Sequence, residues 1–114
     1  MKLAFISDIH SNFDALKAVM IDIKKNKIEK IFCLGDIINY YYEPHKCIDL
    51  LIKNNVKCIK GNHENIFFQT LKSKQKAKIF SKLYGNSIFM NLKLLKKKHL
   101  SFLRSLESRL KFSI

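Results

Sequence analysis

Three short clusters in the sequence contain side chains that could bind metal ions or move protons. They read Asp8-Ile9-His10, Gly35-Asp36 and Gly61-Asn62-His63. Residues two apart on an extended loop lie on the same side, so Asp8 and His10 can bind one cation through an oxygen and a nitrogen. Asp36 can bridge two cations through its two oxygens, Asn62 offers an amide oxygen to the second, and His63 can face a substrate. Two cations bridged in this way lie about 3.5–4 Å apart and activate a water for in-line attack on phosphorus.

Each cluster taken alone has a simpler structural explanation. An Asp or Asn after a strand commonly caps a helix or forms a turn, and Gly-Asp and Gly-Asn pairs mark turns in general. Turn chemistry does not, however, require the three clusters together in the order D-x-H, G-D and G-N-H. We therefore interpret them as parts of one site, which requires a fold that brings them to the same place.

The apolar pattern predicts such a fold. Short apolar runs at residues 2–7, 30–34 and 56–60 are typical of buried parallel strands, and each run ends at one of the three clusters. Helical spacing of apolar residues predicts helices over residues 13–25 and from 44 to about 54. The order is therefore β-α-β-α-β, an α/β arrangement with right-handed crossovers, whose strands end at one edge of the sheet.

The second half of the chain has a different pattern. Helix-forming residues fill positions 66–71 and a Lys-rich stretch at 72–82, and an amphipathic helix is expected over 91–107. Alternation in the last residues resembles the start of a strand. We therefore expect one partial domain over 1–114, made of a β-α-β-α-β metal-site unit (1–64), a helical segment (65–108) and the beginning of a strand (109–114). The leucines expected near one face of the amphipathic helix are Leu95, Leu100, Leu103 and Leu106.

Composition limits the possible functions. The chain has 114 residues and a formal charge of +13, which is compatible with a basic nucleic-acid-binding module that uses the lysines of 72–82 and 93–98. Lys outnumbers Arg twenty to two, a bias that AT-rich codons produce without any ligand. No apolar run approaches the ~20 residues of a membrane span, so we expect a cytoplasmic protein without membrane contact. The three cysteines, with no CxxC spacing, are expected to be reduced core thiols.

The three clusters resemble the motifs of the calcineurin-like metallophosphoesterases, in particular the small prokaryotic phosphodiesterases. The similar segments are S-D-I-H-S-N at 7–12, L-G-D-I at 34–37 and K-G-N-H-E at 60–64. The resemblance implies a sandwich of two sheets flanked by helices, a phosphate-ester substrate and two divalent metal ions (Mn, Fe, Zn or Ni).

Matching the family motifs residue by residue implies a role for each polar side chain. Asp8 and His10 would bind the first metal, Asp36 would bridge, and Asn62 would bind the second. His63 would be catalytic and assist the leaving group. The matched residues expected to support the loops by hydrogen bonding are Asn12 and Glu64.

The chain also departs from the family pattern. The family completes its site with a later H-G motif and a G-H-x-H motif, and neither is present. The only later histidine is His99, which we expect to be exposed on a Lys-rich helix. After Asp36, where relatives often carry Gly-Tyr-Gly-Pro, this chain has Asn39-Tyr40-Tyr41-Tyr42. The second metal site is therefore expected to be incomplete.

These observations predict the N-terminal half of a metallophosphoesterase domain. A parallel sheet with one uncovered face would expose apolar surface, which predicts self-association or a missing C-terminal half as partner. The expected function is metal-dependent hydrolysis of a phosphate ester, most simply a phosphodiester, impaired by the missing half. Two alternatives stay open: a non-catalytic half-domain that needs a partner chain, and a basic nucleic-acid-binding module.

Overall fold

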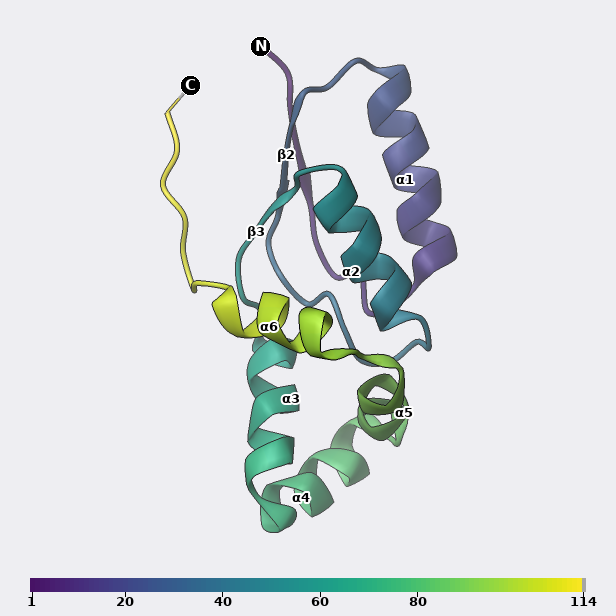
Figure 1. The fold of residues 1–114 in the computed structure, drawn as a ribbon, viewed down its shortest axis with the longest axis vertical. Coiled ribbons are helices and arrows are strands. Elements are labelled where there is room, and N and C mark those ends of the chain that lie inside the picture. Colours follow the sequence, from purple (N-terminus) through teal and green to yellow (C-terminus); the bar gives the residue numbers. More distant parts are fainter. Residues whose placement is uncertain (114) are drawn as a thin grey trace.

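A three-stranded parallel sheet organises the first half of the chain, as seen in a computed structural model that describes residues 1–113 (Figure 1). The strands are β1 (Leu3–Ile6), β2 (Lys30–Cys33) and β3 (Lys57–Cys58), in the order β1-β2-β3. The predicted parallel α/β arrangement is confirmed. The third strand is shorter than predicted because the chain turns away from β2 after Ile59. The Ile59 N–H still donates to the Cys33 carbonyl (2.9 Å), whereas the Lys60 N–H donates to the Glu107 carbonyl (2.7 Å).

Helices α1 (Phe13–Lys25) and α2 (Pro44–Lys53) lie on the same side of the sheet (Figure 1). Their apolar residues recur at helical spacing and are buried in the main core. Asn12 caps α1 by accepting the Ala15 N–H (3.2 Å), and Pro44 begins α2, where its missing N–H costs nothing. The buried residues of the two helices are Leu16, Met20 and Ile23, and Pro44, Cys47, Ile48 and Leu51.

The cysteines are free thiols, in line with the expectation from the sequence. Cys33 and Cys47 are fully buried, and Cys58 is partly buried opposite Cys33 in the sheet. Burial raises the pKa of Cys47 to about 12, so this thiol stays protonated and behaves as a small apolar core residue.

The second half of the chain folds into helices α3 (Asn62–Lys72), α4 (Lys74–Tyr84), α5 (Ser87–Leu94) and α6 (Lys97–Ser105). Helix α3 starts at Asn62, so the G-N-H cluster forms the first turn of a helix rather than a loop. The single amphipathic helix expected over 91–107 is wrong. Leu95 and Lys96 are extended and separate α5 from α6, because His99 Nδ1 accepts the Lys96 N–H (2.9 Å) and starts a new helix there.

His99 is buried, and the expectation that it is exposed is wrong. Only 1% of it is exposed, and its Nε2 lies 2.9 Å from Asp49 Oδ1 on α2. Nδ1 is hydrogen-bonded to the Lys96 N–H and Nε2 to Asp49, so burial of this polar ring leaves neither ring nitrogen without a partner. His99 therefore links α6 to α2 through its contact with Asp49.

The sheet face opposite α1 and α2 has no second sheet among the described residues. Positions 109–113 pass along this side without forming a strand, since no neighbouring strand pairs with them; position 114 lies outside the described residues. The ring of Phe112 stacks on Phe32 with centroids 4.3 Å apart. Phe5 and Leu34 are still 54% and 48% exposed, which makes this face an apolar surface. No helix among residues 1–113 has the length and apolar character that a bilayer crossing needs.

Candidate metal centre

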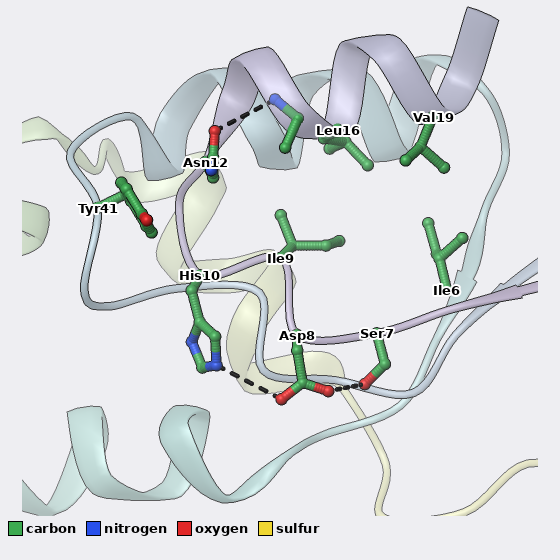
Figure 2. A pocket seen from close by; sticks show the side chains of 10 residues that line it. Ile6, Ser7, Asp8, Ile9, His10, Asn12, Leu16, Val19 and Tyr41 are labelled. Carbon is green, nitrogen blue, oxygen red and sulfur yellow. Dashed lines mark hydrogen bonds and ion pairs between the residues drawn. The ribbon is translucent and has the colours of Figure 1, made fainter. Parts of the chain in front are cut away.

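The loop after β1 presents Asp8 and His10 on one side. Figure 2 shows the Asp8 carboxylate and the His10 ring on the same side of the loop, with Ile9 turned the opposite way toward α1. Asp8 Oδ1 and His10 Nε2 are 3.5 Å apart. Both residues have left-handed backbone conformations, with φ of 56° and 46°. Such strain in non-glycine residues is concentrated at functional sites.

The surroundings of His10 determine which ring nitrogen carries the proton. Its Nδ1 lies 3.1 Å from the backbone carbonyl oxygen of Ile38. Because that oxygen can only accept, Nδ1 must be the donor, and the neutral ring keeps its lone pair on Nε2. Nε2 is the atom that faces Asp8, so His10 is held in the form in which imidazole binds a metal.

Asp36, in the loop after β2, brings a second carboxylate to the same place. One possible ligand atom from each of Asp8, His10 and Asp36 lies within 4.8 Å of the other two. The His10 N–H donates to the Asp36 carbonyl (2.9 Å), so the two loops are joined by their backbones. Two carboxylates and one imidazole suit a divalent first-row cation, and the residues present therefore fit a metal site.

Two glycines permit the loops after β2 and β3 to come together. Gly35 has a φ of +97°, and a Cβ there would collide with the backbone nitrogen of Gly61; a Cβ on Gly61 would in turn collide with the backbone of Asp36. This close approach lets the His63 N–H donate to Asp36 Oδ1 (2.9 Å). The glycines of the G-D and G-N-H clusters are therefore required by packing.

Asn62 lies directly against the Asp36 carboxylate. The amide atom that faces Asp36 is 2.9 Å from Oδ1 and 3.0 Å from Oδ2. If that atom is the nitrogen, the amide hydrogen bonds to the carboxylate; if it is the oxygen, it adds an oxygen beside Asp36 that a cation can share. The structure thus places Asn62 next to the residue that would bridge two metals.

His63 is nearly fully buried beside the same carboxylates. Its ring centroid is 5.0 Å from that of His10, 4.9 Å from that of Tyr40 and 5.0 Å from that of Tyr84 on α4. Burial lowers the pKa of His63, and the neighbouring His10 lowers it further. The helical segment therefore contributes a wall, through Tyr84, to a site whose polar residues all come from positions 1–64.

Glu64 and Asn12 contact the backbone rather than the centre of the site. The buried carboxylate of Glu64 accepts N–H groups from the G-D and G-N-H loops, with the shortest distance 2.8 Å. Burial raises the pKa of Glu64, although these donors oppose the shift. Asn12 Oδ1 accepts the Ala15 N–H and so fixes the start of α1. The donors to Glu64 are the backbone N–H groups of Asp36, Ile37, Ile38 and Gly61.

Sequence reasoning missed two buried asparagines. Asn91 on α5 is fully buried and accepts from Ser11 Oγ (2.5 Å) and from the Asn39 N–H (2.9 Å), so it joins the loops after β1 and β2. Asn39 is also fully buried, and its side chain contacts His63. No local pattern indicates Asn91, because its partners Ser11 and Asn39 lie 80 and 52 positions earlier in the chain.

A cavity of about 300 Å³ lies between α1 and the loop after β1, behind the candidate ligands. Its apolar lining includes Ile9, Leu16 and Val19. Asp8 and His10 also line the cavity, and Figure 2 shows their side chains on the side of the loop opposite Ile9. The cavity therefore borders the place where Asp8, His10 and Asp36 meet.

Comparison with known proteins agrees with this geometry. The family model of the calcineurin-like phosphoesterases matches residues 1–112. The chain belongs to this family. The calcineurin-like chain is 41% identical over 104 residues to an uncharacterized protein of Methanocaldococcus jannaschii, a match that covers 91% of this chain and 41% of the relative.

A solved structure supports the same assignment. The crystal structure of a metallophosphoesterase from Sphaerobacter thermophilus matches with a TM-score of 0.76 and 27% identity, over 98% of this chain and 43% of that one. The calcineurin-like chain therefore spans about two fifths of the length of both relatives.

Proposed function

We propose that this chain carries the first half of the active centre of a metal-dependent phosphodiesterase. The observation that carries the proposal is the meeting of Asp8, His10 and Asp36, whose ligand atoms lie within 4.8 Å of one another. The fixed Nδ1–H form of His10 supports it, since the nitrogen that faces the carboxylates keeps its lone pair. Family membership supports phosphate-ester hydrolysis as the reaction class.

Each residue near the centre has a proposed role. Asp8, His10 and Asp36 would hold one divalent ion, and Asp36 and Asn62 would hold a second. Mn, Fe, Zn or Ni would suit this mixture of oxygen and nitrogen ligands. When bound, such a metal pair supplies Lewis acidity and a water activated for attack on phosphorus.

The remaining polar residues act on the substrate and the loops. His63 lies beside the carboxylates without being among the closely grouped metal-ligand atoms, which favours a role at the leaving-group oxygen. Glu64 supports the G-D and G-N-H loops through the backbone, and Asn12 supports the start of α1.

The centre is proposed to need a C-terminal half for activity. Past His63 the sequence contains one histidine, His99, and it lies against Asp49 between α2 and α6. The second ion would therefore lack imidazole ligands from this chain. The exposed Phe5 and Leu34 on the open sheet face support a partner segment or self-association there. The free thiols fit a reducing compartment, and we propose a cytoplasmic location.

Metal titration of the chain tests the proposal. Calorimetry with Mn²⁺ should give one tight site and a weaker second one, and His10→Ala should abolish the tight site. His99→Ala is the matched control, because it removes an imidazole outside the centre and should leave the metal isotherm unchanged. Equal loss of binding in both variants, or two equal sites in the unmodified chain, would contradict the assignment.

Turnover of a chromogenic phosphodiester tests the missing half. The chain alone with Mn²⁺ should hydrolyse it poorly, and co-expression of a segment that bears the H-G and G-H-x-H motifs should restore turnover. Full turnover by the chain alone would contradict the proposal that the centre needs a C-terminal half.

The exposed apolar face also favours a second candidate function, a non-catalytic half-domain that binds a partner chain. A completed assembly that is soluble but inactive would support that candidate.

A further inference from the structure

Asn39 is a buried residue beside His63 with no role in the metal centre described above. It lies three positions after Asp36, it is completely buried, and its φ is +72°. The Asn39 N–H donates to Asn91 Oδ1 (2.9 Å), which anchors the backbone at this point. The side chain therefore starts from a fixed backbone and has little freedom to choose its partners.

The side-chain amide of Asn39 makes two contacts with His63. Its Nδ2 lies 3.3 Å from the backbone carbonyl oxygen of His63 and 3.2 Å from Nδ1 of the His63 ring. The carbonyl oxygen can only accept, so the nitrogen end of the amide must face it. The opposite orientation would set two oxygens against each other. The orientation of the Asn39 amide is thus determined by the backbone of His63.

The same orientation determines the proton position on the His63 ring. Nδ1 of His63 faces an N–H donor and must accept from it, so a neutral ring carries its proton on Nε2. Among residues 1–113 the described hydrogen bonds of the His63 ring use Nδ1 alone. We propose that Asn39 is a positioning residue that holds His63 in the Nε2–H tautomer through its hydrogen bond to Nδ1.

The two neighbouring histidines are then held in opposite tautomers. His10 donates from Nδ1 to the Ile38 carbonyl and keeps a lone pair on Nε2, whereas His63 accepts at Nδ1 and keeps a proton on Nε2. Their ring centroids are only 5.0 Å apart. A nitrogen with a lone pair can bind a cation, and a nitrogen with a proton can only donate.

The opposite tautomers of His10 and His63 suggest what the Asn39 contact does in catalysis, an inference that rests on the proposed phosphodiesterase function. An Nε2–H on His63 cannot ligate a metal, so Asn39 keeps His63 out of the metal ligand set. The same N–H is available to donate to an oxygen of the phosphate ester.

Ring nitrogen NMR of the metal-free 114-residue chain tests the proposal directly. With ¹⁵N-labelled histidine at about pH 9, ordinary imidazoles with pKa near 6.5 are neutral, and the protonated and unprotonated nitrogens resonate far apart. His63 should show a protonated Nε2 and an unprotonated Nδ1, and His10 the reverse. A protonated Nδ1 on His63 in the unmodified chain would overturn the proposal.

Two substitutions at position 39 should change this signature in different ways. Asn39→Gly removes the amide at a backbone conformation that suits glycine, so the chain should still fold while His63 becomes a mixture of tautomers. Asn39→Asp offers only acceptors and should move the ring proton to Nδ1. An Asn39→Gly spectrum identical to that of the unmodified chain would overturn the proposal.

The control is Tyr84→Leu, which removes a ring that packs 5.0 Å from His63 without hydrogen bonding to it. It should leave the tautomer unchanged; a tautomer change as large as that in Asn39→Gly would mean that packing, not the Asn39 contact, sets the proton position. The measurement needs neither metal nor substrate. Its failure would therefore not touch the phosphodiesterase proposal, and a chain without hydrolytic activity could still give the expected spectrum.

Discussion

His99 and the pair His10 and His63 use their ring nitrogens differently. His99 is buried with both nitrogens bonded inside the protein, Nδ1 to the Lys96 N–H and Nε2 to Asp49. His10 and His63 each use Nδ1 for a protein contact and direct Nε2 elsewhere. A histidine whose two nitrogens are both satisfied can only stabilise the fold, whereas one with a nitrogen to spare can bind a ligand. The hydrogen bonds of the ring nitrogens therefore distinguish the histidines of the candidate metal centre from the histidine of the α2–α6 contact better than their burial does.

Among the substitutions that test this difference, we expect the largest effect from changes at Asp36, which should weaken metal binding. Asp36→Ala should weaken Mn²⁺ binding by more than about 100-fold, which exceeds the loss typical for residues that only orient a ligand. Asp36→Asn keeps the shape of the side chain and an oxygen that can accept the His63 N–H. Because it removes the negative charge, this variant should also lose most of its affinity for Mn²⁺. Asp49→Asn, at the His99 contact, is the control and should bind normally. Calorimetry measures all three, and normal binding by Asp36→Ala would refute the bridging role.

The next effect is on turnover in a protein completed by its C-terminal half. His63→Ala should lower kcat by about 10²- to 10⁴-fold, the usual contribution of a group that assists proton transfer. Metal content should stay unchanged, because His63 is proposed to face the substrate. A fall in metal content in step with kcat would place His63 among the ligands instead. Steady-state kinetics and metal analysis of the same preparations decide between these outcomes.

A smaller effect concerns stability at the second histidine position. His99→Ala leaves the Lys96 N–H and Asp49 without their partner and creates a cavity at a site that is 1% exposed. We expect the free energy of unfolding to fall by about 2–4 kcal/mol, with metal binding unaffected. Lys98→Ala removes only an exposed charge near Asp49 and should cost less than about 1 kcal/mol. Urea denaturation measures both; equal effects would mean that the buried hydrogen bonds contribute little.

The same comparison explains how much of the molecule could be predicted from its sequence. Asp8, His10 and Asp36 follow apolar runs directly, so a local pattern together with the parallel-sheet rule was enough to bring them together. His99 lies between lysines and leucines, and its burial depends on Asp49, fifty positions earlier in the chain. The break at Leu95 depends on the same ring. Long-range polar contacts of this kind leave no periodic signal, which is why the helix over 91–107 was predicted as one.

The smallest expected effect is the pH dependence of the contact between Asp49 and His99. Burial of Asp49 opposes its ionisation, but the hydrogen bond from His99 and the charge of Lys98 lower its pKa below the ordinary value of about 3.9. A carboxyl group whose pKa is lower in the folded than in the unfolded protein stabilises the fold at pH values above its unfolded pKa. This contribution is lost as the pH falls through the folded pKa. Because the Asp49 side chain is 49% exposed, solvent screens the contact and we expect less than about 1 kcal/mol. The unfolding free energies of the unmodified chain and of Asp49→Asn should therefore differ at about pH 6 and converge as the pH falls below the ordinary carboxyl pKa of about 3.9. A difference that persists at the lower pH would show that the contact does not depend on the charge of Asp49.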